Sequence, residues 1–458
     1  MWRPALDSDA ALGYASAMRP MADTIFALAT APGKAGVAVL RLSGPQAGAA
    51  LQALTGKPMP APRRASLRAL RDPQTGETVD RALALWFPAP ASFTGEDVVE
   101  LHIHGGRAVA TALADALSRL SGCRPAEPGE FSRRAFENGR LDLTEAEAIA
   151  DLVAAETAGQ RRQALRQLGG ALGALYADWR ARLLRALAHL EADIDFADED
   201  LPNGTTAAAR PALADLAREI AAHLDDDRRG ERLREGVQIA IVGPPNAGKS
   251  SLLNLLARRD VAIVSETAGT TRDVIEVHLD LGGWPVTLAD TAGIREAGDE
   301  IEREGVRRAE QRARTADLRL VVLDAAAPDT PSMLQELIAP GDVVALNKID
   351  LAPSAKVPAE ALALSVRGGT GVAELLALLQ QRVAALLDGA GMPLTRQRHR
   401  LALEECHAAL KRAQAQKAQP ELMAEDVRLA ARALGRITGR VDVEDMLDIV
   451  FREFCIGK

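Results

Sequence analysis

The stretch that decides the fold reads VQIAIVGPPNAGKSSLLNLLA and occupies residues 237–257. Its first apolar residues predict a strand, residues 243–250 match the GxxxxGKS pattern of a phosphate-binding loop, and the leucines after it predict a helix. In such a loop, backbone N–H groups and the helix N-terminus face the phosphates of a nucleotide. We expect Lys249 to reach the β- and γ-phosphates and the Ser250 hydroxyl to ligate Mg²⁺. The stretch therefore predicts a nucleotide-hydrolysing α/β domain.

Three further motifs follow in the order of a GTPase domain. The run LADTAG ends a predicted strand at Asp290, whose carboxylate can hold the Mg²⁺ shell, while Gly293 offers a backbone N–H to the γ-phosphate. The motif NKID ends at Asp350, where a carboxylate can accept both N–H groups on the guanine edge, a pairing that adenine cannot supply. The run LSVRGGTG, residues 364–371, offers a loop against the base, although it departs from the usual Ser-Ala-Lys pattern. Guanine is therefore the predicted base. The residues expected to contact GTP are Asn246, Ala247, Gly248, Lys249, Ser250, Ser251, Ser265, Glu266, Thr267, Ala268, Gly269, Thr270, Thr271, Asp290, Thr291, Ala292, Gly293, Asn347, Lys348, Asp350, Ser365, Val366 and Arg367.

The catalytic machinery is less standard than the nucleotide site. Ras-like enzymes place a Gln just after the DTAG glycine to orient the attacking water, but Ile294 and Arg295 stand there. The run RRDVAIVSETAGTTRD, residues 258–273, supplies Thr271 as a second Mg²⁺ ligand, and its hydroxyl and carbonyl groups can also hold a monovalent cation. Such a cation can neutralise transition-state charge as an arginine finger does, an effect worth about 10³–10⁵ in rate. Arg272 and Arg295 are competing candidates for that role.

Composition narrows the class of protein. Of the 458 residues, 47% are hydrophobic and 26% are charged, and 63 acidic against 55 basic side chains give a net charge of -8. This sign excludes binding to nucleic acid through bulk electrostatics alone, so any RNA contact must be local or shared with a partner. The cysteines, Cys123, Cys406 and Cys455, lack CxxC spacing, which argues against a disulfide framework or a zinc site. No apolar run of about 18 residues occurs, so we expect a soluble cytoplasmic protein without a membrane segment.

The residue composition and the spacing of apolar residues change along the chain. Strand-like runs separated by turn residues give way at Leu141 to amphipathic helices rich in Ala and Leu, in which Thr144 and Glu147 predict a capping box. Short apolar strands alternating with helices follow and predict a parallel sheet, after which helices return. We therefore expect a multidomain α/β plus α fold, in which a Ras-like P-loop GTPase domain is inserted into a helical domain. The expected parts are a flexible extension at 1–20, an α+β domain at 21–140, helical segments at 141–235 and 389–458, and the GTPase domain at 236–388.

The order of these parts resembles the MnmE (TrmE) family of tRNA-modifying GTPases over residues 24–458. The signatures that carry the resemblance are SFTGEDVVELHIHGG, PGEFSRRAFENGRLDLTEAEAIADL, GPPNAGKSSLLN, TAGTTRDV, DTAGIRE and the terminal CIGK. The resemblance implies a K⁺-dependent GTPase and a homodimer joined through its N-terminal α+β domains. It also implies a heterotetramer with the flavoprotein MnmG (GidA), whose FAD takes part in modifying C5 of the wobble uridine of certain tRNAs. The added group is carboxymethylaminomethyl or aminomethyl, and a tetrahydrofolate supplies one carbon.

Matching positions assign further roles by resemblance. The K⁺ ligands would be Asn246, Ser265, Thr267 and Thr270. Glu302 would organise the attacking water through a bridging water, beside Lys249 and Thr271 as catalytic residues. A 5-formyl- or 5,10-methylene-tetrahydrofolate in the α+β domain would contact Arg41, Glu100, Arg140 and Lys458, where Arg140 replaces a Lys that is usual in the family. Cys455 is either a catalytic or ordering residue or a buried structural thiol.

Other interpretations stay open at this point. A ribosome-assembly GTPase would carry a basic RNA-binding appendage, and a nucleotide-gated folate-binding scaffold would hydrolyse GTP slowly whatever the cation. His102 and His104 point to one face of a predicted strand, where a structural or ligand-lining role outweighs metal binding. The pairs Arg133-Arg134 and Arg161-Arg162 either contact RNA phosphates or, as is commoner, form solvated helix faces. The terminal CIGK does not fit a lipid anchor, because Lys is unusual at the last prenylation position.

Overall fold

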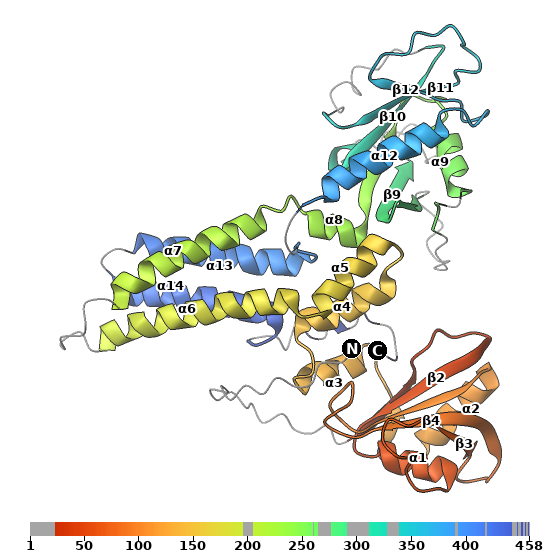
Figure 1. The fold of residues 1–458 in the computed structure, drawn as a ribbon, viewed down its shortest axis with the longest axis vertical. Helices are drawn as coiled ribbons and strands as arrows, with labels where there is room; N and C mark the ends of the chain where they lie inside the picture. Colours follow the sequence, from red (N-terminus) through yellow and green to blue (C-terminus); the bar gives the residue numbers. More distant parts are fainter. Residues whose placement is uncertain are drawn as a thin grey trace, which may run out of the picture. The chain divides into compact units, whose positions relative to one another are not determined.

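The computed structural model describes residues 23–195, 205–259, 261–263, 276–290, 311–327, 339–389, 393–416 and 419–441, together with 447, 450, 451, 454 and 457. These residues fall into two compact units (Figure 1). The first unit comprises the described residues up to Ala150 and those beyond 442, and the second comprises Asp151–Val441. The extension expected at 1–20 lies outside the described residues.

The first unit is built on a six-stranded sheet. Its strands are β1 (Thr24–Leu28), β2 (Ala35–Ser43), β3 (Ser66–Arg71), β4 (Thr78–Phe87), β5 (Val98–Gly105) and β6 (Cys123–Pro125), in the order β3-β4-β5-β2-β1-β6. Neighbouring strands are antiparallel except β1 and β6, which run parallel. Alternate residues such as Leu40 and Leu42 enter a core shared with α1 (Ala47–Thr55) and α2 (Arg107–Ser118). Strand-like runs of the sequence at residues 24–30, 36–44, 81–90 and 98–106 lie largely in β1, β2, β4 and β5, and the shorter β3 and β6 complete the sheet.

Two helices, α3 (Glu130–Glu137) and α4 (Leu143–Ala154), follow this sheet, and α4 does not begin with the predicted capping box. Asp142 caps it instead: its Oδ1 accepts from the backbone N–H of Glu145 at 2.9 Å, and Glu145 Oε2 accepts from the backbone N–H of Asp142 at 2.8 Å. The Thr144 hydroxyl donates to Asp142 at 2.6 Å, and both Thr144 and Glu147 are buried. The helix begins at Leu143, beside Thr144 as the predicted pattern implies, but the capping residues were wrong because two capping patterns overlap here. The carboxylate of the earlier pattern also complements the helix dipole.

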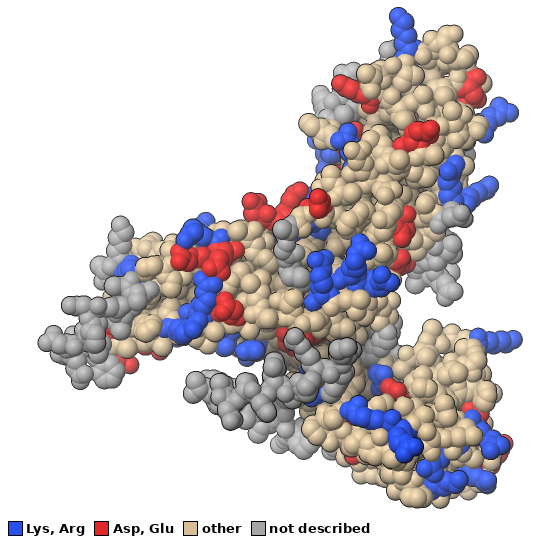
Figure 2. Space-filling view, viewed as in Figure 1, with Lys and Arg blue, Asp and Glu red and all other residues tan. Residues whose placement is uncertain are grey.

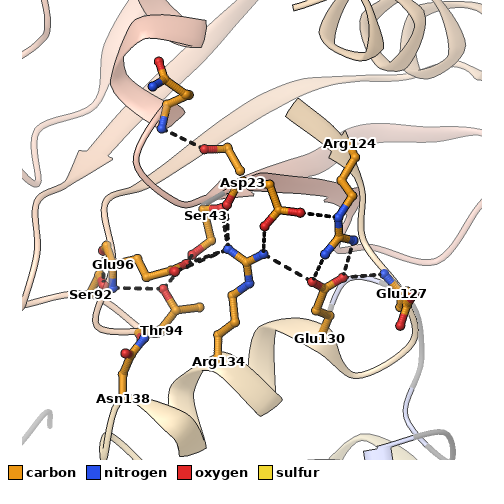
Figure 3. A network of polar contacts seen from close by, with 12 residues as sticks. Asp23, Ser43, Ser92, Thr94, Glu96, Arg124, Glu127, Glu130, Arg134 and Asn138 are labelled. Carbon is orange, nitrogen blue, oxygen red and sulfur yellow. Dashed lines mark hydrogen bonds and ion pairs between the residues drawn. The ribbon is translucent and has the colours of Figure 1, made fainter. Parts of the chain in front are cut away.

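A buried ion network surrounds Arg134 in the first unit (Figure 3). The Arg134 side chain is 1% exposed and pairs with Asp23 at 2.9 Å, Glu96 at 3.1 Å and Glu130 at 3.2 Å. Arg124 binds Asp23 and Glu130 in turn. Burial alone would raise the pKa of Glu130, but hydrogen bonds and charge from Arg124 hold that pKa below its usual value. Arg134 is therefore neither a solvated residue nor an RNA contact, which corrects both interpretations offered for it.

Helices from two distant parts of the sequence share one core in the second unit. They are α6 (Ala171–Asp195), α7 (Thr205–Leu224), α13 (Gln397–Ala415) and α14 (Pro420–Thr438). Their apolar residues recur three and four apart and face inward, as the amphipathic pattern predicts. Two shorter helices, α5 (Ala158–Leu168) and α8 (Arg229–Glu235), precede the α/β segment. None of the helices described is long and apolar enough to cross a membrane.

A second six-stranded sheet lies between these helical segments in the chain. Its elements are β7 (Val237–Val242), α9 (Lys249–Ala257), β8 (Glu276–Leu281), β9 (Trp284–Asp290), β10 (Leu318–Asp324), β11 (Val343–Asn347), β12 (Ala361–Ala363) and α12 (Val372–Leu387), with strand order β12-β11-β10-β7-β9-β8. The sheet is parallel, as predicted, except that β8 pairs antiparallel with β9. The exception arises at Gly282 and Gly283, whose φ angles of 65° and 93° suit a two-residue hairpin turn.

Replacing Arg134 with Ala should destabilise the first unit far more than the same change at its neighbour Arg133. Arg134→Ala leaves carboxylates without their shared cation, and removing one partner of a buried ion pair costs about 3–5 kcal/mol in the free energy of unfolding. Arg133→Ala removes a partly exposed pair with Glu137 one helical turn away, and such pairs are worth about 0.3–0.5 kcal/mol. Amide hydrogen exchange of β1, β2 and β5 in the full chain measures both losses for this unit. Equal losses in the two variants would contradict the role given to the network.

Candidate functional site

The phosphate-binding loop lies between β7 and α9, at the carboxyl edge of the parallel strands. Two of its positions admit only glycine. Gly243 has φ 154°, and a Cβ there would lie 2.1 Å from the carbonyl oxygen of Val322. Gly248 has φ 99°, and a Cβ there would lie 2.2 Å from Nδ2 of Asn347. The backbone of the loop is thus pressed against β10 and the NKID motif, which holds it in place.

Lys249 and Ser250, the first residues of α9, take the positions expected of a phosphate-binding site. The Lys249 ammonium donates to the carbonyl oxygens of Gly243 and Pro244, both at 2.9 Å, so it lies within the loop. Burial lowers the pKa of Lys249, and the nearby carboxylate of Asp290 opposes that shift. The Ser250 hydroxyl donates to Asp290 Oδ2 at 2.6 Å. This hydroxyl and carboxylate at the end of β9 are hard oxygen donors of the kind that Mg²⁺ prefers.

Asn347 joins the base-binding motifs to the phosphate-binding loop. Its Nδ2 donates to the carbonyl oxygen of Ala247 at 2.8 Å, and its Oδ1 accepts from the backbone N–H of Val366 at 3.1 Å. The Ser365 hydroxyl donates to Asp350 Oδ1 at 2.7 Å, so the two predicted base-binding loops meet at the Asp350 carboxylate. The three motifs therefore converge on one edge of the sheet, and Asp350 stays exposed to receive a base.

Asp324 belongs to this site although none of the predicted motifs includes it. It ends β10, and its Oδ2 accepts from the Lys348 ammonium at 2.7 Å. Lys348 has φ 66°, a left-handed conformation that the ion pair helps to hold. The hydrogen bonds from Lys348 and from the backbone of Ala326 lower the pKa of Asp324. Its position in the sequence could have indicated this role, because Asp324 ends β10, the strand that pairs with the NKID strand β11.

Part of the predicted nucleotide site lies outside the described residues. Asn246, Ser251 and Arg367 are described and exposed, and Asn246 has φ 60° at the top of the loop. The predicted residues outside are Ser265, Glu266, Thr267, Ala268, Gly269, Thr270, Thr271, Thr291, Ala292, Gly293 and Glu302, and so are the two arginine-finger candidates Arg272 and Arg295.

Two of the residues predicted to bind folate, Arg41 and Glu100, meet on the sheet of the first unit. Arg41 on β2 stands opposite Glu100 on β5, and its Nε and Nη2 donate to Glu100 Oε1 at 3.0 and 2.9 Å. The Arg41 guanidinium also lies 5.3 Å from the ring centre of Phe93 and 5.8 Å from that of Phe131. Both partners of the pair are 20% exposed, so they form a charged spot bordered by aromatic rings. Arg140, the third predicted residue, packs its aliphatic stem close to Gly95.

The chain end lies against this sheet. Phe451 and Phe454 pack in a cluster with α4 residues, and a Cβ at Gly129 would lie 2.5 Å from the Phe451 carbonyl oxygen. Gly457 is buried with φ 98°, and a Cβ there would lie 2.3 Å from the carbonyl oxygen of Leu28. Leu28 ends β1, next to the position that pairs with Arg41 on β2. The penultimate residue thus lies close to the row of the Arg41–Glu100 pair, while Cys455 and Lys458 lie outside the described residues.

The described histidines and cysteines form neither a metal-binding cluster nor a reactive thiol site. No cluster of three His, Cys, Asp or Glu side chains there has the geometry to hold a metal ion. His104 instead pairs with Asp80 at 2.7 Å, and His102 Nε2 lies 3.7 Å from Glu100. Cys123 and Cys406 are free thiols. Burial raises the pKa of both, that of Cys406 to about 12, so neither is a reactive thiolate at neutral pH.

The chain was compared with known proteins. The family model of the MnmE helical domain matches residues 143–455, and that of the GTP-binding protein TrmE N-terminus matches residues 24–140. The tRNA modification GTPase MnmE of Parvibaculum lavamentivorans is 61% identical over 95% of this chain and 100% of its own length. That of Paramagnetospirillum magneticum is 60% identical over 96% of this chain and 100% of its own length. Among solved structures, Aquifex aeolicus Era is 28% identical over 38% of this chain and 66% of that one, with a TM-score of 0.27. The chain therefore belongs to the MnmE family of tRNA modification GTPases.

Proposed function

We propose that this protein binds and hydrolyses GTP and uses that cycle to modify C5 of the wobble uridine in certain tRNAs. The observation that carries the proposal is the convergence of Asn347, Asp350 and the phosphate-binding loop on one edge of the sheet, in a chain of this family. The Asp350 carboxylate would accept the N1–H and the amino N–H of guanine, and Ser365 would orient it through their hydrogen bond. GTP is therefore the nucleotide that this edge recognises in our proposal.

The residues of the loop would divide the work on the phosphates. Lys249 would exchange its two carbonyl partners for the β- and γ-phosphate oxygens, which suit a buried ammonium better. Ser250 and Thr271 would ligate Mg²⁺, with Asp290 holding its shell, and the ion would neutralise charge between the β- and γ-phosphates. The Ser250–Asp290 hydrogen bond, which joins α9 to β9, supports this assignment because it already brings the hydroxyl oxygen and the carboxylate oxygen together.

K⁺ would supply the positive charge that an arginine finger supplies elsewhere. Asn246, Ser265, Thr267 and Thr270 would hold it, and Glu302 would orient the attacking water. Asn246 supports this proposal because its left-handed conformation places it, exposed, at the top of the loop that holds the phosphates. The bound cation would then neutralise the negative charge that develops on the phosphates in the transition state, so that no arginine from a partner protein is needed.

The first unit would bind the one-carbon donor, a 5-formyl- or 5,10-methylene-tetrahydrofolate. Arg41, Glu100, Arg140 and Lys458 would contact the folate, and Glu100 would accept N–H groups of its pterin ring, as Asp350 would for guanine. The aromatic rings beside Arg41 and the position of Gly457 near β1 support this assignment. A homodimer joined through this domain would work with the flavoprotein MnmG in a heterotetramer in the cytoplasm, and the FAD of that partner would supply the redox chemistry.

Nucleoside analysis of tRNA from cells that lack this protein tests the proposed function directly. The modified wobble uridines should disappear, and a plasmid with the intact gene should restore them. Liquid chromatography with mass spectrometry of digested tRNA provides the measurement. Wobble uridines that stay modified in the deletion strain would rule out the tRNA reaction proposed here.

GTP hydrolysis should run faster in KCl than in NaCl at equal ionic strength. Glu302→Ala should lower the rate in KCl on the order of a hundredfold or more, because the attacking water loses its orienting carboxylate. Glu304→Ala removes the same charge two residues away and is the matched control, expected to keep most of the rate. Phosphate release under single-turnover conditions measures all three. Equal rates in the two salts would count against the K⁺ site.

Removing residues 455–458 should abolish tRNA modification and leave GTP hydrolysis intact, since the tail docks on the sheet of the first unit. Gly457→Ala should weaken the same docking, because Ala is strained at φ 98° and its Cβ would collide with Leu28. Modification assays and GTPase assays on both variants separate the two activities. Loss of GTP hydrolysis together with modification would mean that the tail mainly holds the fold together.

A further inference from the structure

A cavity in the second unit has no part in the nucleotide site. It lies where α5, α8, the β8–β9 turn and the end of α12 meet, and its volume is about 120 Å³. Its main lining residues are Arg162, Arg166, Arg229, Trp284, Asp388 and Pro393. Figure 2 shows Lys and Arg side chains gathered on the surface around α5, next to this cavity.

Two arginines of α5, Arg162 and Arg166, line this cavity. Among the residues that the structure describes, no carboxylate pairs with Arg162 or Arg166, and both are exposed. Several other arginines of this unit do pair with carboxylates: Arg232 with Asp317 at 2.6 Å, Arg396 with Asp151 at 2.7 Å, and Arg400 with Asp226 at 2.6 Å. In a chain of net charge -8, two unpaired guanidinium groups on one helix face are a local excess of positive charge.

The four-residue spacing of Arg162 and Arg166 places their like charges side by side, where they repel each other. Residues four apart lie on the same side of a helix, where like charges destabilise it slightly. Attraction to the helix dipole accounts for Arg166, which is in the last turn of α5, but not for Arg162 in its middle. An anion held between the two would remove the repulsion, because a guanidinium can bind a phosphate through two parallel N–H donors.

The cavity lining also includes a third guanidinium, that of Arg229, and the aromatic surface of Trp284. Arg229 is held in place by donating to the main-chain carbonyl of Asp388 at 3.3 Å. Trp284, half-buried at the start of β9, packs beside Gly159, whose Cβ, if present, would lie 3.1 Å from the indole ring. Guanidinium groups beside an indole are the combination with which proteins bind single-stranded or looped RNA, the former on phosphates and the latter on a base.

We propose that this cavity is a docking site for the phosphate backbone of the substrate tRNA, with Arg162 and Arg166 on phosphates and Trp284 against a base. The proposal rests on the tRNA reaction proposed above. It also meets the requirement that the acidic charge of the chain imposes, since an RNA contact here must be local rather than spread over the surface.

The test uses the full chain with both arginines neutralised, Arg162→Gln with Arg166→Gln, and an unmodified tRNA transcript. Fluorescence anisotropy between about 50 and 200 mM KCl gives the affinity and its salt dependence. For each phosphate that the variant no longer neutralises, the slope of log affinity against log salt should fall by about 0.7–0.9, and the affinity at low salt should fall about tenfold or more. Trp284→Leu should weaken binding several-fold without changing the slope, because stacking releases no counterions.

The control pair, Arg185→Gln with Arg382→Gln, removes the same charge from exposed arginines that do not line the cavity. It should keep its tRNA affinity within about twofold, and both pairs should keep their GTPase rate and melting temperature, since these side chains are exposed. Normal tRNA binding by the Arg162/Arg166 variant overturns the proposal, as does an equal loss in the control pair, which would indicate bulk charge. Normal tRNA binding together with lost affinity for the flavoprotein partner also overturns it and identifies a protein interface. If the unmutated protein itself fails to bind tRNA, the proposed function fails instead.

Discussion

The core shared by α6, α7, α13 and α14 is the constraint on which the second unit depends. Its helices come from segments on either side of the α/β sheet, so the chain must leave the bundle, build the sheet and return. Their apolar stripes are buried only when both segments are present, because each helix alone would expose its stripe to water. The sheet is therefore joined to the helical bundle by two chain connections.

Within the sheet, parallel pairing places the strand ends that carry the predicted nucleotide-binding motifs on one edge. The loop after β7, the Asp at the end of β9 and the NKID motif after β11 come together there because their strands run in the same direction. Asn347 then connects the base side to the phosphate side through the Ala247 carbonyl. One buried amide thus sets the relative positions of two motifs that are about a hundred residues apart.

The two units use arginine in different ways. Arg134 is buried among carboxylates and serves the fold, since an unpaired charge at that depth would cost several kcal/mol. Arg41 is partly exposed, paired on one side with Glu100 and bordered by aromatic rings, an arrangement suited to a ligand. Arg162 and Arg166 are exposed and have no carboxylate partner among the described residues. The surroundings of each guanidinium therefore distinguish an arginine that stabilises the fold from one that is available to bind a ligand.

Local patterns of sequence determined the elements and the nucleotide chemistry. The phosphate-binding loop, the base motif and most strands were predictable because each depends on contiguous residues at fixed spacing. Tertiary structure alone decided which of two overlapping capping patterns begins α4, that β8 turns back on β9, and that Lys348 pairs with Asp324. It also decided the burial of Arg134, whose partner Asp23 is 111 residues away. The physical reason is that the energy of a charge depends on the groups around it, and distant segments bring most of those groups together only in the folded chain.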